Sequence, residues 1–275
     1  SKHTLATRSI VIATGAAPFV PPLPGIDDVG YLTSDTLWGL REQPKRLVVL
    51  GGGPIGCELA QSFARLGSAV TQIEMLPRIM IREDEEVSAF AKKALEHDGV
   101  RVLTNHKALR CERRADGTKA IVVESGGQQS AIEFDVLLCA VGRSARLKGF
   151  GLEELGIPVN KTVQVNEFLE TNFPNSLAAG DVAGPYQFTH TAAHQAWYAS
   201  VNALFGTFKK FKADYSVIPW ATFIDPEVAR ASVMAWSSGM VSSSASIELW
   251  PELISALVSC SVGALRASSS SVIEV

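Results

Sequence analysis

One glycine pattern, Gly51-x-Gly53-x-x-Gly56, limits the folds open to this chain more than any other feature. It directly follows a run of apolar and β-branched residues over Arg46–Leu50, and it opens a segment with helical periodicity over Pro54–Leu66. Between a strand and a helix, the first glycine permits a tight turn, the second lets the backbone approach a pyrophosphate, and the third allows close packing. The free N–H groups of the helix N-terminus favour an anion. The sequence therefore predicts a dinucleotide-binding turn.

An acidic residue completes this pattern. Glu74 closes the next predicted strand, Val70–Glu74, about 20 residues after the glycines, where a carboxylate can accept hydrogen bonds from both ribose hydroxyls. The carboxylate favours NAD, because a 2′-phosphate would face an anion; Arg78 lies close enough in sequence to keep NADP open as a less favoured alternative. We expect the dinucleotide to contact Gly51, Gly53, Pro54, Ile55, Gly56, Glu74 and Gly142.

Strands and helices alternate after the glycines. The periodicity predicts a helix over Asp84–His97, a strand over Val100–Leu103 and an apolar strand over Val136–Val141. Residues 107–134 read as three short strands, with turns at Asp116-Gly117 and Gly126-Gly127. The expected fold is α/β: a three-layer, Rossmann-like NAD domain with a parallel sheet covered on both faces.

Shorter elements flank this unit on both sides. An apolar strand over Arg8–Ala13 leads into Thr14-Gly15, and the four prolines of Pro18–Gly25 indicate a connection between domains. After Arg143 the pattern predicts two more strands and a long helix, over Val163–Val165, Leu177–Ala179 and Thr189–Leu204.

Composition narrows the partners and the compartment. With 47% hydrophobic and 19% charged residues the chain is globular, and at a net charge of −3 without a basic stripe it is not expected to bind nucleic acid. The four cysteines are far apart and form no CxxC pair, which favours a reducing, cytoplasmic setting. No apolar run approaches the roughly 20 residues of a membrane helix, and the start without Met reads as mid-protein.

Three further features leave alternatives open. Asp181 follows an apolar strand and could meet a ligand at the sheet edge, although a turn or capping aspartate is the commoner role. His190 and His194 could share a metal, but no third ligand stands beside them, so no metal site is expected. Cys57 opens a helix, where a thiol pKa can fall, but an inert buried thiol is favoured.

Several ordered motifs resemble the class I pyridine nucleotide-disulfide oxidoreductases, the group of dihydrolipoamide dehydrogenase, glutathione reductase and mercuric reductase, with mercuric-reductase-like members closest. The resemblance covers residue 4 to about residue 230. The motifs are Thr7–Gly15, Gly51–Gly56 with Glu58, Ala60 and Gly67, Ala140–Arg143, Thr171–Asp181, and Tyr215–Arg230 with its Asp225-Pro226-Glu227.

The resemblance implies an FAD-dependent oxidoreductase that passes electrons from NAD(P)H through the flavin to a disulfide or a metal-type acceptor, as a homodimer in the intact family. It implies that Glu58 lies near the nicotinamide and that Asp181 holds the ribityl chain of the flavin. The helix entered through Phe188 would point its N-terminus at the flavin ring. The FAD residues implied in this way are Thr14, Gly15, Arg143, Gly180, Asp181, Phe188 and Thr189.

The chain departs from the family pattern in three places. It lacks the family's first GxGxxG motif, its CxxxxC redox disulfide and its C-terminal His-Glu pair. We therefore expect a partial FAD-binding domain at 1–41 and 142–212, an NAD domain at 42–141 and the start of a dimerisation domain at 213–230. Residues 231–275 are rich in serine, poor in charge and unlike that domain, as if translated in a wrong frame. Reading the coding DNA in the other frames tests this hypothesis.

Two rival functions follow from these departures. In the first, the chain is an NAD-binding module without catalytic activity, and strands left unpaired promote aggregation. In the second, it is a flavin-free dehydrogenase with a single nucleotide site, against which the Ala13-Thr14-Gly15 and Gly180-Asp181 motifs argue.

Overall fold

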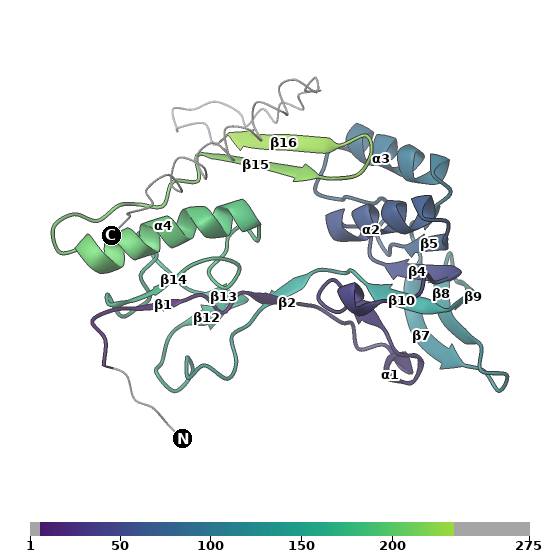
Figure 1. The fold of residues 1–275 in the computed structure, drawn as a ribbon, viewed down its shortest axis with the longest axis horizontal. Helices are drawn as coiled ribbons and strands as arrows, with labels where there is room; N and C mark the ends of the chain where they lie inside the picture. The colour runs from purple at the N-terminus through teal and green to yellow at the C-terminus, as the bar shows by residue number, and fades with distance from the viewer. Residues whose placement is uncertain (1–5, 234–275) are drawn as a thin grey trace, which may run out of the picture.

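A five-stranded sheet forms the centre of the larger part of the molecule (Figure 1). The computed structural model describes residues 6–233. All four pairs of neighbouring strands are parallel, which confirms the expected α/β class. In sheet order the strands are β3 (Leu32–Thr33), β10 (Val136–Cys139), β4 (Arg46–Leu50), β5 (Ala69–Ile73) and β6 (Arg101–Leu103).

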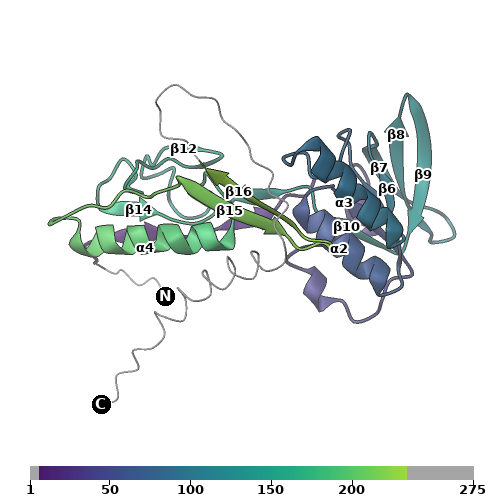
Figure 2. The ribbon, with the colours of Figure 1, turned by 90° about the horizontal axis from the view of Figure 1, so that it is seen from above.

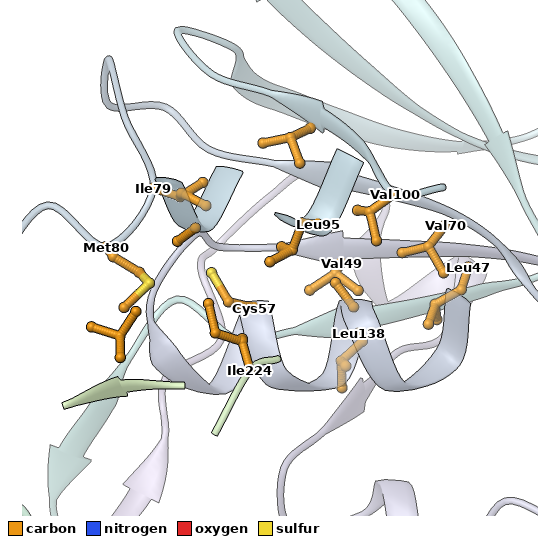
Figure 3. Packing of buried hydrophobic residues seen from close by; sticks show 14 of the residues in the cluster. Leu47, Val49, Cys57, Val70, Ile79, Met80, Leu95, Val100, Leu138 and Ile224 are labelled. Carbon is orange, nitrogen blue, oxygen red and sulfur yellow. The ribbon is translucent and has the colours of Figure 1, made fainter. Parts of the chain in front are cut away.

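Two helices, α2 (Pro54–Arg65) and α3 (Glu85–His97), cover one face of this sheet. Side chains alternate between the faces along a strand, so Leu47 and Val49 of β4 both point toward the helices. There they share a buried apolar core with Cys57 of α2, Leu95 of α3 and residues of the neighbouring strands (Figure 3).

An antiparallel meander covers the opposite face. It consists of β7 (Lys107–Arg113), β8 (Lys119–Ser125) and β9 (Gln128–Phe134), joined by tight turns at the predicted glycines. Val48 and Leu50 of β4 pack on this side with Phe134 and with Ile26 of the short helix α1 (Ile26–Val29). The third layer is therefore a meander rather than a second pair of helices.

The sheet begins earlier in the chain than the expected boundary at residue 42. Leu32 and Thr33 of β3 pair with β10, and the N–H of Cys111 in the meander donates to the Pro24 carbonyl at 2.8 Å. These backbone contacts bind the proline-rich segment to the meander. We call α1, β3 to β10, α2, α3 and the short 3-10 helix η1 (Leu37–Gly39) the sheet region.

Smaller sheets and one long helix make up the other end of the molecule, which we call the α4 region (Figure 1). Strand β1 (Ile10–Ile12) pairs parallel with β14 (Ser176–Ala178) beneath α4 (Thr189–Phe205). Strand β2 (Ala16–Pro18) pairs antiparallel with β11 (Arg143–Ala145), and β12 (Val159–Asn160) pairs with β13 (Thr162–Val163). The segments before and after the sheet region therefore meet here.

A final hairpin lies between the two regions, as the view from above makes plain (Figure 2). Its strands are β15 (Val217–Thr222) and β16 (Val228–Val233), and Ile224 in its turn enters the core under α2. Residues 231–233 thus continue a strand instead of beginning the tail expected at 231–275. Residues 234–275 lie outside the described part. No helix within residues 6–233 is long and apolar enough to cross a membrane.

Candidate functional site

Three backbone segments approach one another closely at the turn after β4. Gly51 has a φ of +117°, which side chains rarely adopt, and its N–H donates to the Ile73 carbonyl at 2.8 Å. An ideal Cβ on Gly51 would lie 2.4 Å from the Ala140 carbonyl oxygen, and one on Gly56 would lie 2.2 Å from the Gly51 carbonyl oxygen. Both positions therefore require glycine.

Glu74 lies beside this turn, directly after β5. Its Oε2 accepts the N–H of Gly52 at 2.7 Å and its Oε1 accepts the N–H of Leu76 at 2.8 Å. Each carboxylate oxygen has a further lone pair, so the half-buried side chain can still accept hydrogen bonds from a ligand. The structure thus brings Glu74 to the glycine turn, as predicted.

The N-terminus of α2 opens onto free space. Gly53 is the N-cap, Pro54 occupies the first turn, and no side chain caps the helix. An ideal Cβ on Gly53 would meet nothing within 4 Å. Helix geometry leaves the N–H groups of Ile55 and Gly56 without an intrahelical acceptor, and the helix dipole adds positive potential. This end of the helix fits a pyrophosphate.

Gly142 follows β10, the strand next to β4, and so lies at the same edge of the sheet as the glycine turn. Its φ is +126°, with open space where a Cβ would stand. Arg78, in contrast, donates from Nη1 to the Glu83 carbonyl at 2.6 Å. The N–H groups of the first turn of α2, one carboxylate and open backbone therefore converge on one edge, which is the set that a dinucleotide needs.

In the α4 region, Arg143 joins three of the predicted segments. Its Nη2 donates to the Ala16 carbonyl at 2.9 Å, its Nη1 lies 3.3 Å from an oxygen of Asp35, and its Nε lies 3.9 Å from Asp181. Thr14 donates from its hydroxyl to the Arg146 carbonyl at 2.8 Å. These contacts bring Thr14, Arg143 and Asp181 to the ends of β1, β2 and β14.

A buried glutamine fixes the loop after β14. The Oε1 of Gln195 accepts the N–H of Gly180 at 2.6 Å, and its Nε2 donates to the Gly184 carbonyl at 2.5 Å and the Tyr215 hydroxyl at 2.7 Å. An ideal Cβ on Gly180 would lie 3.4 Å from Ala192, so the loop passes close to the first turn of α4. Gly180 and Asp181 are therefore held against the helix.

The N-terminus of α4 is also uncapped by any side chain. Phe188, its N-cap residue, stacks on His190 at 5.3 Å and on Trp220 of the hairpin at 6.0 Å between ring centroids. Thr189 is exposed beside it. The first-turn N–H groups and their positive potential fit an electron-rich ring or an anion near Asp181.

Glu58 is held by the hairpin. Its Oε1 accepts the N–H of Phe223 at 2.9 Å. One and two turns further along α2, the amide of Gln61 bonds both the N–H and the carbonyl of Asp225, at 2.7 and 2.8 Å, and Arg65 pairs with the Asp225 carboxylate at 2.8 Å. Sequence reasoning did not anticipate this contact between α2 and the hairpin.

The surroundings of His190, His194 and Cys57 bear on the roles that the sequence left open for them. Burial lowers the pKa of His190, and His194 Nε2 lies 2.8 Å from the Asp214 carbonyl. Within residues 6–233 no three metal-ligating side chains gather at one point. Burial raises the pKa of the Cys57 thiol to about 12, in spite of the helix N-terminus, and its Sγ lies 3.5 Å from the Gly52 carbonyl.

Comparison with known proteins agrees with this geometry. The model of the pyridine nucleotide-disulphide oxidoreductases matches residues 1–196. The chain belongs to this family. Proteins of the family use FAD together with NADH or NADPH and are oxidoreductases.

Three relatives illustrate the match. A mercuric reductase of Staphylococcus aureus is 37% identical over 233 residues, which are 84% of this chain and 42% of that protein. A dihydrolipoyl dehydrogenase of Thermus scotoductus is 41% identical over 207 residues, 73% of this chain and 44% of that protein. The Escherichia coli flavoprotein disulfide reductase RclA, induced by HOCl, superposes with a TM-score of 0.72 at 33% identity, covering 82% of this chain and 51% of its own. The chain spans about half the length of these relatives.

Two buried glutamines near the predicted residues escaped the sequence analysis. Gln72 lies under the glycine turn, and Gln195 holds the Gly180 loop. Gln195 falls on a helix position that apolar periodicity assigns to the core. A polar residue at such a position indicates a buried side chain with specific hydrogen-bond partners, and this could have identified it. For Gln72 the signal was similar, because it interrupts an apolar strand.

Proposed function

We propose that this chain supplies the NAD site and part of the FAD site of an oxidoreductase that passes electrons from NAD(P)H through flavin to a disulfide or metal-type acceptor. The observation that carries the proposal is the Glu74 carboxylate held 2.7 Å from the Gly52 N–H, beside the open N-terminus of α2. When bound, the nicotinamide gives up a hydride, two electrons with one proton, and the flavin takes the two electrons on to the acceptor.

The residues of the sheet region would bind and orient the dinucleotide. The N–H groups at Gly53, Ile55 and Gly56 face the pyrophosphate, and Glu74 accepts the ribose hydroxyls. NADH is favoured over NADPH, because a 2′-phosphate near Glu74 would be repelled and the Arg78 guanidinium is engaged by the Glu83 carbonyl. Gly142, at the same edge of the sheet, would contact the bound dinucleotide.

The residues of the α4 region would hold the flavin. Asp181 accepts ribityl hydroxyls, Thr14, Gly15 and Arg143 line the strand ends, and Gly180 approaches closely without a side chain. The N-terminus of α4, at Phe188 and Thr189, supplies positive potential toward the ring and so favours its reduced, anionic form. The support is the convergence of Arg143 and Asp181 and the uncapped helix.

Glu58 would lie near the nicotinamide as a positioning residue. Its Oε1 is fixed by the Phe223 N–H, which leaves Oε2 to face the nucleotide. A rigid carboxylate here limits the ring to orientations from which a hydride can reach the flavin.

The remaining expectations belong to the intact protein. We propose a homodimer formed through the domain that begins with residues 213–230, and a cytoplasmic enzyme acting on a small molecule whose identity the chain leaves open. The NAD domain would occupy most of residues 42–141, joined by the segment from α1 to β3, and the FAD domain would use the outer segments.

An absorbance spectrum of the purified chain, recorded with and without added FAD and then during NADH titration, tests this proposal. A retained flavin band that NADH bleaches supports it in full. Saturable NADH binding without a flavin band leaves the NAD-binding module, the second candidate, which is favoured by the exposure of Ile10 (50%) and Val11 (40%) on β1. No NADH binding contradicts both.

A further inference from the structure

Two side chains, one in β5 and one directly after it, hold one peptide unit of the glycine turn. Gln72 and Glu74 are two residues apart, so they point to the same face of the sheet. Gln72 Nε2 donates to the Gly51 carbonyl at 3.0 Å, and Glu74 Oε2 accepts the Gly52 N–H at 2.7 Å. Both the carbonyl and the N–H of the Gly51–Gly52 peptide are therefore hydrogen-bonded, the first by Gln72 and the second by Glu74.

The orientation of the Gln72 amide follows from its surroundings. The side chain is fully buried, and its Nε2 also lies 3.5 Å from Cys57 Sγ. The Oε1 has no hydrogen-bond partner in the described part of the chain. Rotating the amide by 180° would place Oε1 against the Gly51 carbonyl oxygen, two acceptors facing each other. The Gly51 carbonyl thus determines the orientation in which the Gln72 amide directs its Nε2 toward the turn.

Fixing this peptide fixes the next one. The Gly52 carbonyl turns inward and accepts the Met80 N–H at 2.6 Å. Because the two ends of a planar peptide point in opposite directions, the Gly53 N–H then points away from the Met80 N–H that the Gly52 carbonyl accepts. A Cβ on Gly53 would meet nothing within 4 Å, so the start of α2 is open. The direction of this N–H group depends on the peptide that Gln72 and Glu74 hold.

We infer that Gln72 is a positioning residue for the dinucleotide: its amide holds the Gly51–Gly52 peptide so that the following backbone N–H groups face the pyrophosphate. The inference rests on the proposed NAD site and assigns a role to a residue that touches no ligand. Glu74 then holds the same peptide at its N–H end while it binds the ribose. The pyrophosphate and the ribose would therefore both be positioned by side chains of β5 and of the residue that follows it.

The test replaces Gln72 with methionine, Gln72→Met, which keeps the length of the side chain and removes both the donor and the unpartnered Oε1. We expect Kd for NADH to rise about tenfold, equal to about 1.4 kcal/mol, with little change in Tm. Kd for ADP-ribose should rise by the same factor, because it carries the same pyrophosphate. The preference for NADH over NADPH should stay, because Glu74 is untouched.

Gln61→Met is the matched control, since Gln61 is another buried glutamine with a bonded amide, facing the hairpin. It should lower Tm without changing Kd for NADH. Gln72→Leu is the second variant, with the same expectation. Wild-type affinity in Gln72→Met overturns the inference, as does loss of native structure in both Gln72 variants. Failure of the wild-type chain to bind NADH would refute the proposed function itself. This outcome differs from failure of the inference, in which the wild-type chain binds NADH and Gln72→Met binds it equally well.

Discussion

The sheet region and the α4 region contain similar elements but differ in how completely their surfaces are buried. In the sheet region both faces of β4 are covered, and Leu47 to Val49 are at most 1% exposed. In the α4 region, β1 pairs with β14 alone among residues 6–233, and two of its three residues are exposed. A ligand site built within one fully packed unit can be complete even when its neighbour is not.

The same difference separates the two candidate sites. The glycine turn is contacted by β5, by Glu74 and Met80 after it, and by Ala140 after β10, which all belong to the sheet region. The residues proposed for the flavin site gather from segments far apart in the chain, such as Thr14, Arg143 and Asp181. We therefore expect the sheet region to be the more independent unit in both stability and binding.

Thiol labelling gives the largest expected contrast. Burial raises the pKa of Cys57 and Cys139 to about 12 and that of Cys111 to about 11. The thiolate fraction of Cys57 at pH 8 is then about 1000-fold below that of a thiol with a pKa of 9.0. Iodoacetamide should leave all three unlabelled in the native chain, as peptide mass spectrometry can measure.

Cys57, Cys111 and Cys139 lie in the sheet region, so their labelling in rising urea follows this region. Cys260 lies outside the described residues and is measured separately, on its own peptide. Proteolysis within the α4 region should begin at a lower urea concentration. Rapid native labelling of Cys57, or the opposite order in urea, would refute the contrast between the two regions.

A single methyl group should disable the sheet-region site. In Gly56→Ala the new Cβ meets the Gly51 carbonyl oxygen at 2.2 Å, so α2 must move away from β4. We expect NADH affinity to fall about 100-fold, or about 2.7 kcal/mol, by isothermal titration calorimetry. Gly39→Ala is the control, because a Cβ there meets nothing within 4 Å. Equal affinities in the two variants would mean that the glycine turn is not the binding site.

Nucleotide selectivity should change less. In Glu74→Gln an amide replaces the carboxylate that repels a 2′-phosphate, so the preference for NADH over NADPH should fall about tenfold. Competition titrations with both nucleotides measure the ratio. An unchanged preference would show that Glu74 does not face the ribose.

Sequence reasoning predicted the longer helices and the glycine turn well because their patterns are local. The helix from Pro54 ends at Arg65 rather than Leu66, and the helix from Thr189 ends at Phe205 rather than Leu204, small shifts at frayed ends. The glycines and Glu74 are brought together as predicted, because strand, turn and helix are consecutive.

The contacts that sequence could not supply join distant segments. β3 belongs to the sheet although it has only two residues, too few for any periodicity. The Glu58–Phe223 contact spans 165 residues, and nothing in either local sequence indicates it. Gln195 fixes Gly180 through an amide whose partners are two backbone groups and the distant Tyr215 hydroxyl, a set with no local sequence signature.

The smallest expected effect tests whether the hairpin belongs with the sheet region. Asp98 accepts from Arg65 and Gln61, the residues that hold Asp225, and the Arg65 guanidinium is the main cause of its lowered pKa. Because the pKa of Asp98 is lower in the folded chain than in the unfolded chain, its carboxylate stabilises the fold at a pH above the unfolded pKa. This contribution is lost as the pH falls through the folded pKa. Asp98→Asn should lower Tm slightly at pH 7, and the two melting curves should converge below pH 3.8. A constant Tm difference down to pH 2 would contradict this.

The central claim is that the dinucleotide site is complete within this chain while the flavin site is built from separated segments. Parallel calorimetric titrations of the same purified chain with NADH and with FAD test it most directly. The account predicts saturable NADH binding at one site per chain, weakened about 100-fold by Gly56→Ala, and FAD binding that is weaker than NADH binding. Tight FAD binding without any NADH binding would contradict it.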